Sequence, residues 1–122
     1  MSTTNVIATI LTFNRKALLC EALDAILEQD GGAPDILIVD NHSTDGTKET
    51  VERYLSLPNV YYVDTGENLG GAGGFNYAIK SAMKMGYDRL WIMDDDCVPQ
   101  KGALSALRDA DFSLNGEFGW LS

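Results

Sequence analysis

Positive charge is scarce in this chain of 122 residues. Lysine and arginine number 9 against 18 aspartates and glutamates, so the formal net charge is −9 and the isoelectric point is about 4.3. Because nucleic-acid phosphates are bound by basic patches, this composition argues against DNA or RNA as a partner. It does not exclude a phosphorylated small molecule, since backbone N–H groups, a helix terminus or a bridging cation can hold a pyrophosphate.

Cysteine is also sparse, and only Cys20 and Cys97 are present. They lie far apart in unlike contexts, which excludes a disulfide framework and the spacing of a cysteine metal site. Free thiols in a reducing compartment are the expected state. The sequence also lacks a signal peptide and an apolar run long enough to cross a bilayer. We therefore expect a cytoplasmic protein, with peripheral attachment to the inner face of the membrane through other parts left open.

Short apolar runs alternate with amphipathic segments along the chain, whose length argues for one domain. The runs predicted as strands are residues 6–12, 35–40, 60–63 and 89–93, with another strand starting at 118. The predicted helices are residues 17–27, 47–55, 75–85 and 102–108. This alternation predicts an α/β fold with a mainly parallel sheet, helices on both faces and right-handed crossovers.

Each of the four strands is followed by polar or glycine-rich residues that ordinary packing does not require. The four exits are Thr12–Arg15, Asp40–Ser43, Asn68–Gly71 and Asp94–Asp96. In an open α/β sheet, ligands bind beyond the carboxyl ends of the strands. We therefore expect these segments to meet at one edge of the sheet and form a site.

The run Asp94, Asp95 and Asp96 ends a buried strand, where adjacent carboxylates repel one another and resist desolvation. In an extended segment Asp94 and Asp96 can converge while Asp95 points elsewhere. Mg²⁺ or Mn²⁺ suits such oxygens and usually sits between carboxylates and substrate phosphates. The alternative is a solvated acidic turn, and the place of the run at the ligand edge favours the metal site.

Glycines dominate the segment predicted as a loop, residues 65–74. A dinucleotide fingerprint is rejected, because Asn76 occupies its third glycine position and the loop does not follow the first strand. Gly70, Gly71, Gly73 and Gly74 instead fit a backbone that comes close to a ligand, before a helix whose N-terminus favours anions. A purely structural tight turn is the alternative for any one of them.

Single residues at the exits have two interpretations each. Asp40 can accept a hydrogen bond from a nucleotide base, or cap the next turn. Arg15 can contact phosphate, or lie solvated at a helix start. His42 is given no role, and Cys97 has no neighbouring base that would make it a nucleophile.

As an ensemble, these motifs resemble the N-terminal part of an inverting glycosyltransferase of family two, with the Rossmann-like GT-A fold. The matching segments are residues 12–15 (TFNR), 38–41 (IVDN), 43–47 (STDGT), 68–76 (NLGGAGGFN) and 91–96 (WIMDDD). The glycine-rich segment most resembles those of galactofuranosyl- and rhamnosyltransferases. The likeness implies metal-dependent transfer of a hexose from a UDP- or dTDP-sugar, such as UDP-galactofuranose or dTDP-rhamnose. The acceptor would be a glycan or lipid-linked molecule in cell-surface polysaccharide synthesis.

The resemblance also implies site residues. The donor would be bound by Thr12, Asn14, Arg15, Asp40, Asn41, Asn68, Gly70, Gly71, Asp94 and Asp95. Asp40 would hold the uracil or thymine ring. Asp94 and Asp96 would be the D-x-D pair on Mg²⁺ or Mn²⁺ and the diphosphate, with Asp95 near the ribose or sugar.

Members of this family run considerably longer, and their acceptor-binding part and catalytic base lie beyond the matched region. We therefore expect residues 1–122 to be an incomplete donor-binding domain that transfers nothing alone and has an edge that invites self-association. A sugar nucleotidyltransferase is disfavoured, because no glycine-rich basic loop follows the first strand. A non-catalytic nucleotide-sugar-binding module is the other alternative.

Overall fold

The chain folds as one parallel sheet with helices on both faces. The computed structural model describes residues 6–29, 32–103 and 119–121. In order, the elements are β1 (Val6–Thr12), α1 (Lys16–Leu27), β2 (Asp35–Asp40), α2 (Thr47–Leu55), β3 (Val60–Asp64), α3 (Gly70–Lys84), β4 (Arg89–Asp94) and β5 (Gly119–Leu121). The sheet order is β3-β2-β1-β4-β5, and each neighbouring pair is parallel. The predicted α/β, Rossmann-like architecture is confirmed.

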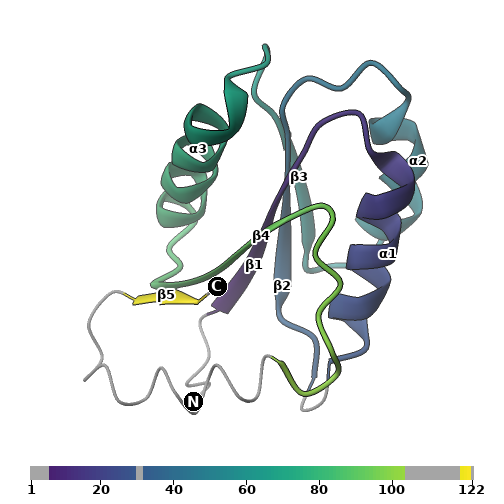
Figure 1. The fold of residues 1–122 in the computed structure, drawn as a ribbon. Coiled ribbons are helices and arrows are strands. Elements are labelled where there is room, and N and C mark those ends of the chain that lie inside the picture. The colour runs from purple at the N-terminus through teal and green to yellow at the C-terminus, as the bar shows by residue number, and fades with distance from the viewer. Residues whose placement is uncertain (1–5, 30–31, 104–118, 122) are drawn as a thin grey trace.

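The central strand β1 fixes the edge at which the other strands end. All seven of its residues are buried, because α1 and α2 cover one face of the sheet and α3 covers the other (Figure 1). In the register, Thr12 lies opposite Asp40 of β2, while Leu11 lies opposite Asp94 of β4. The carboxyl ends of these three strands therefore align at one edge of the sheet.

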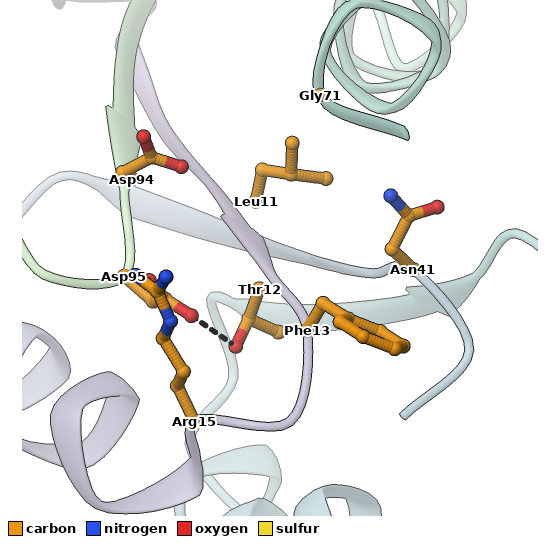
Figure 2. A pocket seen from close by; sticks show the side chains of 8 residues that line it. All are labelled: Leu11, Thr12, Phe13, Arg15, Asn41, Gly71, Asp94 and Asp95. Carbon is orange, nitrogen blue, oxygen red and sulfur yellow. Dashed lines mark hydrogen bonds and ion pairs between the residues drawn. The ribbon is translucent and has the colours of Figure 1, made fainter. Parts of the chain in front are cut away.

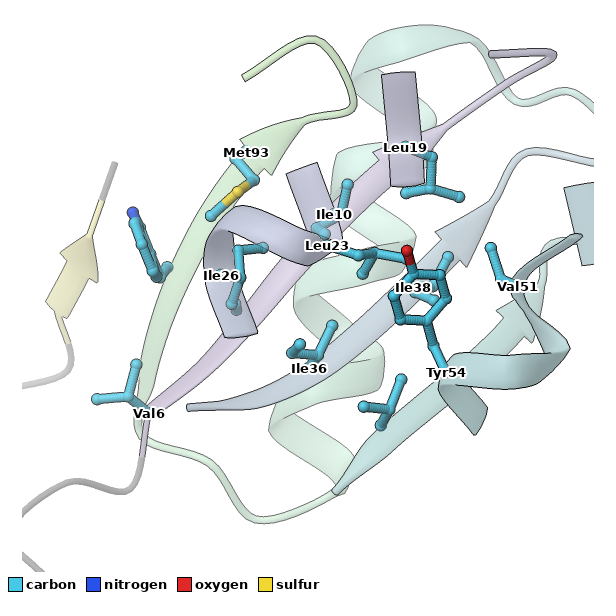
Figure 3. Packing of buried hydrophobic residues seen from close by; sticks show 13 residues of the cluster. Val6, Ile10, Leu19, Leu23, Ile26, Ile36, Ile38, Val51, Tyr54 and Met93 are labelled. Atoms are coloured by element: carbon cyan, nitrogen blue, oxygen red, sulfur yellow. The ribbon is translucent and has the colours of Figure 1, made fainter. Parts of the chain in front are cut away.

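Two hydrophobic clusters hold the helices against the sheet. On one face, Leu23 and Ile26 of α1 pack with Ile10 and Ile38, and Figure 3 shows this cluster. Buried residues recur at three- and four-residue intervals in α1, which gives the helix a single apolar face. On the other face, α3 contributes the small residue Ala78 to the second cluster. Small side chains on α3 allow this helix to approach β1 closely.

The start of α3 differs from the prediction. The helix begins at Gly70, whereas residues 65–74 were predicted as a loop and the helix from 75. Glycine disfavours helices when it is considered alone, but here packing decides. A Cβ added at Gly74 would lie 2.7 Å from Leu11 Cδ1 and 3.1 Å from Asn41 Nδ2. Gly74 therefore lets the helix press against β1.

The remaining differences are small. β3 and β4 each extend one residue further than predicted, and α1 begins one residue earlier. Most of the helix predicted at residues 102–108, and the strand start at 118, lie outside the described residues, although β5 itself was anticipated. Within the described part of the chain, every helix is too short or too polar to cross a membrane.

Candidate functional site

A cavity of about 200 Å³ opens where the carboxyl ends of β1 and β4 meet the start of α3 (Figure 2). Its lining residues are Leu11, Thr12, Phe13, Arg15, Asn41, Gly71, Asp94 and Asp95. All four strand exits picked out from the sequence contribute at least one of these residues. The sheet topology thus brings together segments that are up to 83 positions apart in the chain.

Asp95 is the buried member of the acidic run, with 3% of its surface exposed. Its Oδ2 atom accepts a hydrogen bond of 2.9 Å from Thr12 Oγ1, and its Oδ1 atom lies 3.4 Å from Arg15 Nη1. The same guanidinium nitrogen lies 3.9 Å from Asp96 Oδ2. Asp94 and Asp96 are both exposed. Asp95 therefore points away from the solvent that Asp94 and Asp96 face, and a hydrogen-bonded positive charge compensates its burial.

Within the acidic run, the carboxyl group of Asp94 has a raised pKa. Partial burial raises the pKa of its carboxyl group above 3.8, and the charges of Asp95 and Asp96 raise it further, against the opposing effect of Arg15. A cation beside Asp94 would offset these negative charges, so the donor set suits a hard divalent ion. Within residues 6–29, 32–103 and 119–121, no three carboxylate, imidazole or thiol side chains are grouped to hold a metal unaided. The Asp94–Asp96 metal pair stays a prediction, and such an ion would need oxygens from water or phosphate.

Asn41 joins the exit of β2 to the start of α3. This residue is only 3% exposed, and its Nδ2 donates to Gly70 O over 3.0 Å. Its Oδ1 accepts hydrogen bonds from Leu69 N at 2.8 Å and from Thr65 Oγ1 at 3.2 Å. Asn41 thereby fixes the first turn of α3 at the cavity, where Gly71 lines the wall with open space around it. The N-terminus of a helix at this point favours a bound anion.

Four of the predicted donor-binding residues do not line the cavity: Asn14, Asp40, Asn68 and Gly70. Asp40 is 2% exposed, and its carboxylate accepts hydrogen bonds from Ser43 N and from the Tyr62 hydroxyl. Burial and this bond to Asp40 raise the pKa of Tyr62. The turn-capping alternative for Asp40 is therefore present, and its contact with a base stays a prediction.

The other three residues outside the cavity wall also make local contacts. Asn68 Oδ1 accepts a hydrogen bond of 2.9 Å from Gly70 N. Gly70 has a φ of 75°, a conformation that glycine adopts without strain. Asn14 bonds to the loop that follows β2. These contacts shape the loops around the cavity. Direct contact of these residues with the nucleotide-sugar donor stays a prediction.

Phe13 and Leu11 line the cavity and were not predicted as site residues. The signal for Phe13 was a large aromatic residue directly after a buried strand, inside a polar exit. Its side chain is 39% exposed and lines the cavity, so its ring could stack on a planar group there. Leu11 carried no such signal, because an apolar residue within a buried strand is expected in the core.

Comparison with known proteins places the chain in a family. The model of glycosyl transferase family 2 matches residues 8–110. The chain is 36% identical over 94 residues to the galactofuranosyltransferase GlfT1 of Mycolicibacterium smegmatis, a match that covers 77% of this chain and 30% of that protein. GlfT1 of Mycobacterium tuberculosis is 33% identical over 97 residues, covering 77% of this chain and 31% of that protein. The chain thus spans about a third of the length of these relatives.

Solved structures agree with the fold. The mannosyltransferase PcManGT from Pyrobaculum calidifontis, in complex with GDP-Man and Mn²⁺, matches with a TM-score of 0.67 and 30% identity over 83% of this chain and 30% of that one. Residues 1–349 of S. aureus TarS, in complex with UDP-GlcNAc, match with a TM-score of 0.73 and 26% identity over 92% of this chain and 31% of that one. The expected GT-A fold is thereby confirmed. On the family match and the curated relatives, this chain belongs to glycosyl transferase family 2.

Proposed function

We propose that this chain forms the donor-binding part of an enzyme that transfers a hexose from a nucleoside-diphosphate sugar. The observation that carries the proposal is the cavity where Asp94, Arg15 and the first turn of α3 surround one space. A diphosphate needs positive partners, which a guanidinium, a helix N-terminus and a carboxylate-bound cation supply. Three relatives support this ligand class, since GlfT1 is a galactofuranosyltransferase and two solved neighbours hold GDP-Man or UDP-GlcNAc.

In this proposal Asp94 and Asp96 hold Mg²⁺ or Mn²⁺. Both carboxylates are exposed and offer hard oxygen ligands, and the raised pKa of Asp94 reflects partial burial and the negative charges of Asp95 and Asp96, which a bound cation would offset. When bound, the ion supplies positive charge to the departing diphosphate. The Arg15 side chain is 54% exposed and reaches both Asp95 and Asp96, so it can add a second positive charge at the same phosphates. The neighbour that holds Mn²⁺ supports the use of a divalent ion.

Phe13 is the proposed platform for the nucleobase. Its exposed ring borders the cavity on the side of β1, and aromatic stacking tolerates any base. We propose UDP- or dTDP-sugars as donors, with UDP-galactofuranose favoured by the name of GlfT1 and dTDP-rhamnose as the alternative. Recognition of the uracil or thymine ring by Asp40 belongs to this proposal. It requires that the base displace or share the hydrogen bonds from Ser43 and Tyr62.

The complete reaction also needs a catalytic base and an acceptor site. We propose an inverting transfer, in which a carboxylate base deprotonates the acceptor hydroxyl while the metal site holds the leaving group. We place this base and the acceptor site in the part of the longer relatives that the chain does not match. The acceptor would be a glycan or lipid-linked molecule of the cell surface, used at the cytoplasmic face of the membrane.

Calorimetric titration tests the donor site. UDP, dTDP and GDP are titrated into the 122-residue chain with and without Mn²⁺. We expect binding of UDP or dTDP that strengthens with Mn²⁺ and loses this metal dependence in the double variant Asp94→Asn, Asp96→Asn. Asp88→Asn, which removes an exposed carboxylate next to the opposite end of β4, is the matched control. Absence of nucleotide binding under every condition would contradict the proposal.

A further inference from the structure

We propose that Asn14 is a positioning residue of the donor site, which holds Phe13 and Arg15 in place through the loop after β2. This inference rests on the proposed donor site. Asn14 lies between two lining residues in sequence, yet it does not line the cavity itself. Its side chain instead faces the neighbouring loop, to which the chain is joined at Asn14 and at Lys16.

Four hydrogen bonds join residues 14–16 to residues 43–45, and we call this set the loop bridge. The Asn14 backbone N–H donates to Ser43 Oγ over 2.8 Å, and Thr44 N–H donates to Asn14 Oδ1 over 2.7 Å. Lys16 N–H donates to Asp45 Oδ2 over 3.3 Å, and Lys16 Nζ donates to Asp45 O over 2.8 Å. The bonds run in both directions, so each loop fixes the position of the other.

Two residues in the loops joined by the loop bridge have a left-handed backbone conformation, which is uncommon outside glycine. Asn14 has a φ of 52°, and His42 in the partner loop has a φ of 69°. Asparagine and histidine enter this region more readily than other non-glycine residues, and such conformations are often found at functional sites. Phe13 and Arg15, on either side of this left-handed residue Asn14, both line the cavity.

The sheet anchors the loop bridge at its far end. Ser43 N–H donates to Asp40 Oδ1 over 2.9 Å, and Asp40 is a buried residue at the end of β2. A continuous path of hydrogen bonds therefore runs from β2 through Asp40 and Ser43 to Asn14. Preorganised site residues need such support, because a small displacement from the productive geometry weakens binding.

Two substitutions break the loop bridge from opposite sides. Asn14→Gly removes the acceptor for Thr44 but keeps the positive φ, which glycine adopts freely. Ser43→Ala removes the acceptor for Asn14 N–H at a residue outside the cavity wall. Ser56→Ala is the matched control, since Ser56 Oγ donates to Arg53 O at the far end of α2. UDP affinity with Mn²⁺ is measured by calorimetry, and the mobility of the Phe13 and Arg15 amides by ¹⁵N relaxation without ligand.

We expect Asn14→Gly and Ser43→Ala each to weaken UDP binding about ten-fold, while the double variant is no weaker than either single variant. Both should raise the mobility of the Phe13 and Arg15 amides, and Ser56→Ala should change neither quantity. A loss with Asn14→Gly but not with Ser43→Ala would mean that Asn14 contacts the donor directly, and would overturn the inference. Unchanged affinity in both variants would make the bridge purely structural and overturn it as well. If the wild-type chain binds no nucleotide, the proposed function itself fails before any variant is compared.

Discussion

Thr12 Oγ1 donates a 2.9 Å hydrogen bond to Asp95 Oδ2, across 83 positions of sequence. The two residues are 1% and 3% exposed, so the bond is made out of contact with bulk water. It ties the end of β1 to the turn after β4, and it orients the carboxylate run at the cavity. Because a buried carboxylate is costly without donors, this bond supports both stability and site geometry.

Replacing Thr12 by valine should destabilise the fold. The variant keeps the shape of the side chain but leaves Asp95 without its hydroxyl donor, so we expect a loss of about 1–3 kcal/mol in the free energy of unfolding. Urea denaturation measures this loss. Thr12→Ser keeps the hydroxyl and should remain closer to the wild type, and an equal loss in both variants would contradict the role assigned to the bond.

The pKa of Asp94 should lie above 3.8 in the metal-free protein and fall when Mg²⁺ and a nucleotide bind. Burial and the neighbouring carboxylates favour its protonated form, so the folded state holds this proton more tightly than the unfolded chain does. The stabilising contribution of that proton is present below 3.8 and is lost as pH rises through the raised pKa. An NMR titration of the Asp94 carboxyl carbon measures both values. A pKa that does not change with Mg²⁺ and nucleotide would argue against Asp94 as a metal ligand.

Gly74→Ala should destabilise the protein although alanine favours helices. The added Cβ would lie 2.7 Å and 2.9 Å from the two methyl groups of Leu11, which is buried in β1. Overpacking of this kind costs about 1–3 kcal/mol, more than the gain of about 1 kcal/mol in helix propensity. Gly71→Ala is the control in the same helix, since its Cβ would meet no described atom within 4 Å. In thermal unfolding, the melting temperature of Gly74→Ala should be lower than that of the wild type, and that of Gly71→Ala should be equal or higher.

Phe13→Ala should weaken nucleotide binding without affecting pyrophosphate. Loss of one base–aromatic stack costs about 1–3 kcal/mol, which is roughly 5- to 150-fold in Kd. Competition between UDP and pyrophosphate for the Mn²⁺-loaded chain distinguishes the contribution of the base to affinity from that of the diphosphate. Tyr61→Ala removes a similarly exposed aromatic side chain on the edge strand β3 and serves as control. Equal weakening of UDP and pyrophosphate would place Phe13 at the phosphates.

The predicted strand ends agree with the structure to within one residue for β1 to β4, and the predicted parallel sheet is confirmed. Strand prediction succeeded because burial imposes a local pattern, in which apolar runs such as residues 35–40 are bounded by turn residues. The predicted start of α3 was wrong because the close approach of Gly74 to Leu11 overrides the low helix propensity of glycine. No local signal encodes that contact, which links positions 63 apart.

The sequence alone was enough to predict which segments lie at the edge that carries the cavity, because parallel strands joined by helices place their carboxyl ends together. Only the tertiary structure decided what each polar residue does there. Asp40 and Asn14 were predicted to bind the donor alongside Asp94 and Arg15, yet the first two bond to Tyr62 and Thr44 while the last two line the cavity. The physical reason is that a hydrogen bond depends on distances of about 3 Å between atoms that lie 22 or 30 positions apart in the chain. Those distances are set by how the helices and loops pack, and not by the strand pattern.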